Sequence, residues 1–345
     1  MSISNCVLPA EWQPQAAVLL TWPHAHSDWR PSLAAVERTF TLLSTEISRW
    51  QALVIACYDA AHRDHVQALL RTTAAVMERI QLYCVPSNDA WARDHGPITV
   101  YRDGRPVLLD FRFNGWGDKY AHELDDRVTA RLHRLGAFGT TPLQTMDLIL
   151  EGGSIESDGR GTLLTTGQCL LTPTRNGLPR EILERRLREL LGIERFLWLN
   201  QGHLSGDDTD SHIDTLARFC DPGTIAYQVC TDPTDDDYAS LKEMEQELRA
   251  FRTPAGVPYR LVPLPWPQPR YDEEGRRLPA GYANFLIINN AVLVPTYDDP
   301  ADAQALACLR VCFPGREVIG IPCLPLIQQY GSLHCVTMQL PAGVL

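Results

Sequence analysis

The chain has 345 residues, of which 45% are hydrophobic and 21% are charged, a composition typical of a folded globular protein with a substantial core. Its formal net charge of -11 argues against nucleic acid as a partner and is compatible with a cationic ligand. No run of 18 apolar residues occurs, and the first residues do not resemble a signal peptide. We therefore predict a cytoplasmic protein without membrane contact, whose ten cysteines are free thiols.

The first predicted elements are a buried strand, AAVLLTWP (16–23), a helix that opens at Pro31, and a second strand at 52–57. From Asp59 onward one order of elements recurs: a helix, a strand, a loop and a hairpin. The predicted helices are 59–71, 122–135, 180–191, 235–251 and 301–312. The predicted hairpins turn on Asp103-Gly104, Asp158-Gly159, Asp221-Pro222-Gly223 and Asn289-Asn290.

The fifth repeat is incomplete, because GSLHCVTMQL (331–340) supplies a single strand where the others have a hairpin. The unpaired strand at 16–20 could complete it and so join the two ends of the chain. Five units of about 60 residues predict a closed radial arrangement, since each unit alone cannot bury its apolar faces. We predict an α/β five-bladed propeller, closed by its N- and C-terminal strands, as a single domain over residues 1–345; the alternative is an open mixed sheet.

The segment GDDTDSHID (206–214) is unusually acidic, with four carboxylates and one histidine. One interpretation is a solvated surface loop. A calcium loop fails on spacing, because Ile213 stands where a glycine is required and no glutamate closes the loop. His212 and Asp214 are predicted to stand at the entrance to a strand, where alternation would point both to one side; Asp207 and Asp208 are interpreted as loop residues.

Four residues that can carry chemistry occupy equivalent places in these repeats. Asp94, Glu151 and His212 each precede a hairpin strand, and Cys335 has the matching position in the last repeat. Each alone has a simpler interpretation, such as pairing of Asp94 with Arg93, turn chemistry at Glu151 or core packing at Cys335. In a pseudosymmetric ring equivalent positions converge on the axis, so we predict a site there, with Asp214 beside the histidine.

Several longer motifs carry a resemblance to a known family: WARDHGP, FNGWGDKY, LEGG, the His-x-Asp of 212–214, YANFLIINNAVLVP and GSLHCVTMQ. In their order and spacing, over essentially the whole chain, they resemble the agmatine deiminases and bacterial peptidyl-arginine deiminases. The resemblance implies the five-bladed pentein fold. The chain differs from the family pattern at Ser211, where a glycine is common, and at Ser332 and Leu333, in place of a glycine-rich run.

The resemblance also implies catalytic roles. Asp94 and Asp214 would hold a guanidinium group in bidentate hydrogen bonds. Cys335 would attack its carbon, and His212, oriented by Glu151, would protonate the departing ammonia and then activate water. No metal and no cofactor are required.

The expected partner is a small cationic guanidino compound, and a homodimer is the candidate assembly. Free arginine would need a cation for its carboxylate, and Arg93, Arg112 and Lys119 are the candidates. Agmatine needs none, because aromatic walls such as Trp91 and Trp116 suit its tetramethylene tail and ammonium. We therefore predict that agmatine is converted to N-carbamoylputrescine and ammonia, with peptidyl-arginine as the alternative substrate.

Two other classes of protein remain open from the residues. The first is a metal-dependent amidohydrolase, although the alternating pattern of a (β/α)₈ barrel is absent. Its candidate ligands include His24, His26, His203 and His212. The second is a non-catalytic guanidine-binding or amidinotransferase-like relative, against which the complete set of catalytic residue types argues.

Overall fold

The computed structural model describes residues 6–345, which form an α/β fold. Its residues divide into two compact units. Among the described residues, the first unit comprises Cys6, 13–152 and 334–345, and the second comprises 7–12 and 153–333. The single domain over 1–345 stays a prediction. Within 6–345, no helix is both long and apolar enough to cross a membrane.

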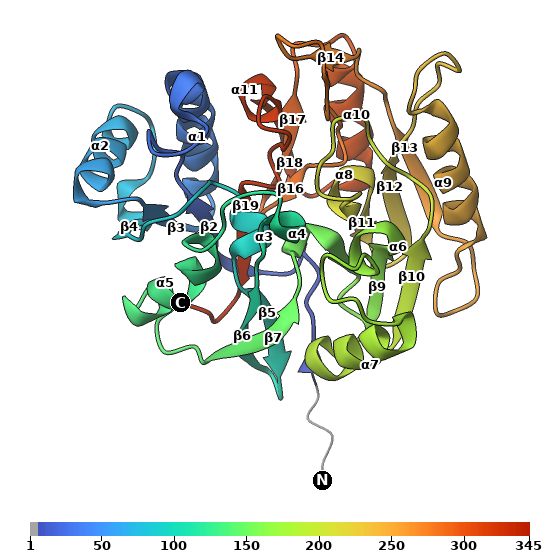
Figure 1. Cartoon of the computed structure of the whole chain (residues 1–345), viewed down its shortest axis with the longest axis horizontal. Helices are drawn as coiled ribbons and strands as arrows, with labels where there is room; N and C mark the ends of the chain where they lie inside the picture. Colours follow the sequence, from blue (N-terminus) through green and yellow to red (C-terminus); the bar gives the residue numbers. More distant parts are fainter. Residues whose placement is uncertain (1–5) are drawn as a thin grey trace. The chain divides into compact units, whose positions relative to one another are not determined.

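One sheet of the first unit joins the two ends of the chain. Its strands lie in the order β19, β2, β3, β4. Their bounds are Thr337–Pro341, Gln15–Thr21, Ala52–Cys57 and Ile80–Cys84. β19 runs antiparallel to β2, with Thr337 opposite Leu20, which confirms the predicted pairing. Helices α1 (Leu33–Ser48) and α2 (Ala60–Arg71) connect the parallel strands and pack against β3 and β4 (Figure 1).

The second sheet of this unit contains β5 (Ile98–Arg102), β6 (Arg105–Arg112) and β7 (Leu143–Ile149). The predicted hairpin turn is confirmed: Asp103 and Gly104 have φ of 49° and 77°, the positive values that a tight two-residue turn requires. The helix predicted at 122–135 is shorter. Its first part is the 3₁₀ turn η3 (Asp125–Arg127), and α5 follows (Val128–Arg134).

Three sheets of the second unit share one connectivity, an antiparallel hairpin followed by a parallel strand. The strands are β8 (Ile155–Ser157), β9 (Thr162–Thr166) and β10 (Arg195–Leu199); β11 (Ala217–Asp221), β12 (Thr224–Gln228) and β13 (Arg260–Leu264); and β16 (Leu286–Ile287), β17 (Ala291–Thr296) and β18 (Glu317–Pro322). The same connectivity occurs in β5–β7 and in β19–β2–β3. The recurring order of elements is therefore confirmed.

A helix precedes the parallel strand in each of these three sheets: α7 (Arg180–Leu191), α9 (Tyr238–Ala250) and α10 (Asp302–Cys312). α7 shows why they form, because Leu183, Leu187 and Leu191 recur on one face and are buried. Gly192 ends it with φ of 71°.

The remaining elements are short, and among them the proline-rich insertion carries a small ribbon, β14–β15. Their bounds are β1 (Cys6–Val7), η1 (Arg30–Ser32), η2 (Met77–Arg79), α3 (Ala92–His95), α4 (Gly115–Asp118), η4 (Gly152–Ser154), α6 (Gly167–Leu170), α8 (Ile213–Leu216), β14 (Arg270–Tyr271), β15 (Arg277–Leu278) and α11 (Leu324–Ile327).

Two predicted strand positions are wrong. His212 is the N-cap of α8 and Asp214 lies in its first turn, so the strand begins only at Ala217. Cys335 likewise lies in a buried turn before β19 begins at Thr337. A helix of one turn is too short to produce a periodic pattern, which is why the sequence did not reveal α8.

Candidate active site

In the first unit, Arg93 ties the cysteine segment to the helical turn α3, which carries Asp94. The Arg93 backbone NH donates to the Cys335 carbonyl oxygen at 3.1 Å. Its side chain donates through Nε to the His334 carbonyl at 3.4 Å and through Nη1 to Gln339 Oε1 at 2.5 Å. All four residues of α3 are buried. Arg93 is therefore a structural clamp, which weakens its candidacy for binding a substrate carboxylate.

The Asp94 carboxylate is oriented by the indole of Trp116, whose Nε1 donates to Asp94 Oδ2 at 3.0 Å. Trp116 has φ of 57° and follows Gly115, where a Cβ would lie 2.4 Å from the Tyr120 carbonyl oxygen. The Trp116 ring also packs edge-on against Phe113, with centroids 5.0 Å apart. Trp116, predicted only as a wall for the substrate tail, thus contacts a predicted catalytic carboxylate directly.

The segment before α3 is held by hydrogen bonds to two aspartates. Asp125 accepts hydrogen bonds from the backbone NH groups of Asn88 and Asp89, at 2.7 and 3.2 Å. Asp89 accepts one from Trp29 Nε1 at 2.6 Å, and burial raises the pKa of Asp89 to about 6. The Trp29 ring lies 5.4 Å from that of Trp91. Trp91 therefore packs against a tryptophan that is itself held by a hydrogen bond to Asp89.

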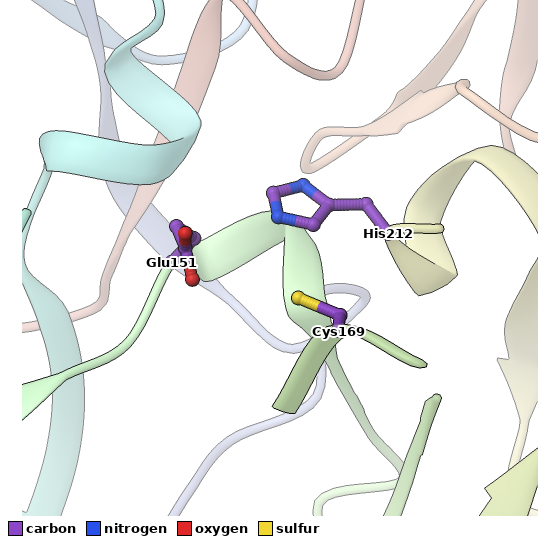
Figure 2. A group of neighbouring side chains, drawn as sticks. All are labelled: Glu151, Cys169 and His212. Atoms are coloured by element: carbon purple, nitrogen blue, oxygen red, sulfur yellow. The ribbon is translucent and has the colours of Figure 1, made fainter. Parts of the chain in front are cut away.

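Glu151, labelled in Figure 2, follows β7 and is completely buried. The next residue is Gly152, where a Cβ would lie 2.2 Å from the Arg93 carbonyl oxygen. Real Cβ atoms do not approach so closely, so the backbone after Glu151 can touch α3 only because residue 152 is glycine. Three predicted site residues, Asp94, Glu151 and Cys335, thus lie on segments of the first unit that all contact Arg93.

In the second unit, the acidic segment is braced by its own side chains. Asp207 accepts hydrogen bonds from Thr209 Oγ1 at 2.5 Å and from the Ser211 backbone NH at 2.7 Å. Asp210 Oδ2 accepts one from Arg175 Nη1 at 2.6 Å. Thr209 Oγ1 in turn accepts from the His212 NH at 3.2 Å. Asp207 is thus a loop residue, as interpreted from the sequence, and together with Asp210 it braces the segment that leads to His212.

His212 and Asp214 are both about 1% exposed. The Ser211 carbonyl accepts a hydrogen bond from Thr166 Oγ1 at 2.8 Å, and the Asp214 carbonyl accepts one from Asn284 Nδ2 at 3.3 Å. Ser211 has φ of 67°, a conformation that glycine adopts without strain. This value explains why a glycine suits the position before the histidine.

The sequence analysis did not single out Cys169, which lies close to His212. Thr166 caps the short helix α6 by accepting from the Cys169 NH at 3.3 Å. The Cys169 sulfur lies within 4.8 Å of a ring nitrogen of His212, and Figure 2 shows the two side chains. Nothing around Cys169 in the sequence marks it, because the contact joins two distant loops.

A buried ionic cluster lies beside Asp214 in the same unit. Arg218 donates through Nε to Glu156 Oε2 at 2.6 Å, through Nη2 to Glu11 Oε2 at 2.9 Å and through Nη1 to the Phe285 carbonyl at 2.7 Å. Burial acts to lower the pKa of Arg218, but the charges of Glu156, Glu11 and Asp214 raise it. Arg218 therefore stays cationic near Asp214. No sequence motif marks Arg218 as a residue of interest.

Two of the histidines considered as metal ligands, His24 and His203, make local hydrogen bonds. His24 Nδ1 accepts from the His26 NH at 3.2 Å, and His24 Nε2 lies 3.2 Å from the Ser87 carbonyl oxygen. Burial lowers the pKa of His24 to about 4. His203 Nδ1 lies 2.7 Å from Ser240 Oγ. Structural roles account for all of these contacts.

Comparison with known proteins assigns the chain to one class of enzyme. The family model of the Porphyromonas-type peptidyl-arginine deiminases matches residues 7–341. A putative agmatine deiminase from Vibrio parahaemolyticus is 33% identical, over 97% of this chain and 96% of the relative. A solved structure described as a putative arginine deiminase from Porphyromonas gingivalis is 52% identical, with TM-score 0.93 over 98% of this chain and 99% of that chain.

Another solved structure is an agmatine deiminase from C. jejuni, a cysteine-to-serine variant with substrate bound, 36% identical with TM-score 0.90 over 97% of this chain and 96% of that one. Together these matches define a hydrolase with an α/β fold that acts on a carbon–nitrogen bond of a guanidino group. Within that class, the chain belongs to the Porphyromonas-type peptidyl-arginine deiminase family, which also has agmatine deiminases among its relatives.

Proposed function

We propose that this protein hydrolyses agmatine to N-carbamoylputrescine and ammonia, with Cys335 as the nucleophile. The observation that carries the proposal is the arrangement around Arg93, whose backbone bonds the Cys335 segment and whose own helical turn carries Asp94. A buried thiol and a carboxylate fixed by an indole NH suit a flat, cationic substrate.

In the proposed reaction, Asp94 and Asp214 hold the guanidinium by hydrogen bonds that fix its plane. The Cys335 thiolate attacks the guanidinium carbon and forms a carbon–sulfur bond. His212, oriented by Glu151, then protonates the departing nitrogen, and the carbon–nitrogen bond breaks to release ammonia.

The second half returns the enzyme to its starting state. His212, now neutral, takes a proton from water, and the hydroxide attacks the thiouronium carbon. Collapse of this intermediate breaks the carbon–sulfur bond, so the oxygen stays on the ureido product and Cys335 leaves as the thiolate. The net change is addition of one water and loss of one ammonia.

The choice of agmatine rests on the groups near the proposed site. Arg93 is engaged by Gln339 and by the His334 carbonyl, and Arg112 and Lys119 are exposed, so no buried cation is assigned to a substrate carboxylate. The apolar tail of agmatine suits the tryptophans Trp91 and Trp116. Relatives described as agmatine deiminases support the same choice.

The test is kcat/KM for agmatine, L-arginine and an N-acetyl-arginine amide under identical conditions. We expect agmatine to be preferred over arginine by about a hundredfold or more, because a carboxylate without a partner is costly to bury. Equal rates with arginine would contradict the assignment to agmatine. A preference for the amide would favour the second candidate, a peptidyl-arginine deiminase, which the description of the family supports.

We further propose that the five repeated sheets are the blades of one closed ring over residues 1–345. The pairing of β19 with β2, which joins the ends of the chain, supports this arrangement. A dimethylarginine dimethylaminohydrolase (TM-score 0.50, 10% identity) and an amidinotransferase from Microseira wollei (TM-score 0.51, 12% identity) share the fold. A small cationic guanidino ligand, a homodimer and a cytoplasmic location complete the proposal.

A further inference from the structure

Two cysteines outside the proposed active site approach each other in the second unit. Cys220 lies on β11 and is buried, and Cys312 is the last residue of α10 and is partly exposed. Their side chains are close enough to share a hydrogen bond. Cys312 is therefore the more exposed residue of the pair, and Cys220 is its buried neighbour.

The backbone explains why these two residues meet. The register between β11 and β12 shifts between Phe219 and Asp221, so Cys220 occupies a β-bulge. Asp221 is opposite Thr224, which is opposite Arg260, and this row across the sheet brings the Arg260 side chain to the same end. Helix α10 packs against β13, whose first residue is Arg260, and so delivers Cys312 there. A bulge also leaves the strand room to adjust locally.

The surroundings give the two thiols different chemistry. The hydrogen bond from Cys220 lowers the pKa of Cys312 against the effect of burial. The charge of Arg260 and a hydrogen bond from its side chain lower it further, whereas the charge of Asp221 raises it. Burial raises the pKa of Cys220. Low thiol pKa with partial exposure is the condition for a reactive cysteine, and a buried neighbour is placed to resolve the product.

We propose that Cys312 and Cys220 form a peroxide-reactive dithiol, with Cys312 as the attacking residue and Cys220 as the resolving residue. The Cys312 thiolate attacks one oxygen of hydrogen peroxide, the O–O bond breaks, and after protonation water leaves and a sulfenic acid remains. The Cys220 sulfur then attacks the Cys312 sulfur, the S–O bond breaks, and the hydroxyl leaves as water with the Cys220 proton. Two thiols lose two electrons and one peroxide gives two waters.

A second pair of neighbouring cysteines serves as a comparison for Cys220 and Cys312. Cys57 and Cys84 are directly opposite on the parallel strands β3 and β4. Burial raises the pKa of Cys57, and its interaction with Cys84 raises it further, so proximity there is not accompanied by activation. Cys308 is a closer comparison, since it precedes Cys312 by one turn of α10, is also partly exposed, and has a pKa that burial raises.

The test is peptide mapping of the full-length protein. The reduced protein is freed of reductant, treated with graded hydrogen peroxide, alkylated with N-ethylmaleimide and digested without reduction. We expect a disulfide-linked peptide pair containing Cys220 and Cys312, which the Cys308→Ser variant retains. In the Cys220→Ser variant, dimedone should label Cys312. Absence of the linked pair in the wild type, at peroxide concentrations that oxidise other cysteines, would overturn the proposal.

A measurement on the unmodified protein covers the case in which Cys220→Ser does not fold. With limiting iodoacetamide at neutral pH, we expect Cys312 to be alkylated at least about tenfold faster than Cys308. Equal rates at the two cysteines of this one helix would contradict the assigned order of attack. Both readouts are chemical, so neither depends on the proposed turnover of agmatine.

Discussion

The indole NH of Trp116 helps to position the Asp94 carboxylate. Its Oδ2 atom accepts from Trp116 Nε1 at 3.0 Å, and Trp116 is itself held in a left-handed conformation by the loop around Gly115. A carboxylate oriented in advance loses less entropy when it binds a guanidinium group. The motif FNGWGDKY therefore has a function that its aromatic composition alone does not suggest.

Trp116→Phe tests this role. The ring remains apolar but its NH is lost, and hydrogen bonds to charged groups contribute about 1.5–3 kcal/mol, so we expect kcat/KM for the guanidino substrate to fall roughly ten- to hundredfold. Trp198→Phe is the matched control, because it removes an indole hydrogen bond to Glu184, at 2.8 Å, in the second unit. Equal losses in both variants would show that Trp116 does not act through Asp94.

Ser211 allows a test of backbone strain next to His212. Because its φ is 67°, Ser211→Gly should stabilise the protein by about 1 kcal/mol relative to Ser211→Ala, which keeps the Cβ and loses only the hydroxyl. Thermal unfolding of the two variants measures the difference. A glycine variant no more stable than the alanine variant would mean that residue 211 is unstrained.

The predicted catalytic residues can be recognised from sequence motifs, but the hydrogen bonds that position them cannot. Asp94, Glu151 and Cys335 are recognisable because each lies in a distinctive short sequence. The Arg93 clamp depends on carbonyl groups more than 240 positions away in the chain, at His334 and Cys335. Contacts of this kind are set by tertiary packing and leave no local pattern.

At the scale of elements, the approach of η4 to α3 depends on a single glycine. Gly152→Ala would place a Cβ 2.2 Å from the Arg93 carbonyl oxygen, so one of the two backbones must shift. We expect a loss of about 1–3 kcal/mol in stability and at least a tenfold loss in kcat/KM, as Glu151 moves with it. Gly315→Ala is the control, because its Cβ would meet nothing within 4 Å. If Gly152→Ala behaves like the control, the two segments do not touch.

Arg218 on β11 joins Glu156 on β8 to Glu11 near the N-terminus. We predict that the contribution of this ionic cluster to stability depends on pH. Burial raises the pKa of Glu156 from 4.5 to about 7, although Arg218 lowers it. A raised carboxyl pKa favours folding below about pH 4.5, and this contribution is lost as the pH rises through about 7. Glu156→Gln cannot ionise, so it avoids that loss.

We therefore expect the Tm of Glu156→Gln, relative to wild type, to be higher at pH 8 than at pH 5. The comparison between two pH values cancels any constant effect of the substitution. Glu243→Gln, an exposed change on α9, is the control for removing one negative charge. A relative Tm that falls between pH 5 and pH 8 would contradict the raised pKa.

Helix prediction succeeded where apolar residues recur at helical spacing over several turns. Helix α7 was predicted with its observed ends, because three leucines mark its buried face and a glycine ends it. The sequence predicts a loop where the single turn α3 lies and a strand entrance where α8 lies, since a helix of four residues shows no repeated apolar spacing. These short helices carry Asp94 and Asp214, so the least predictable elements hold the proposed site.

For the whole molecule, the recurring order of elements was predictable because hairpin turns and amphipathic helices alternate along the chain. The pairing of β19 with β2 followed from counting strands, since one repeat lacked a partner. The division into two compact units could not be predicted from the sequence. Residues 7–12 belong to the same unit as 153–333, and no change in composition separates them from residue 13 onward.

The central claim, covalent deimination by Cys335, is tested most directly by ammonia release from agmatine by the Cys335→Ser variant. We expect a loss of about a thousandfold or more with an unchanged thermal unfolding curve, because a hydroxyl is a far weaker nucleophile than a thiolate. Cys84→Ser, which changes a partly exposed cysteine at the end of β4, should retain full activity. A Cys335→Ser variant that keeps more than about a tenth of the wild-type rate would contradict the account.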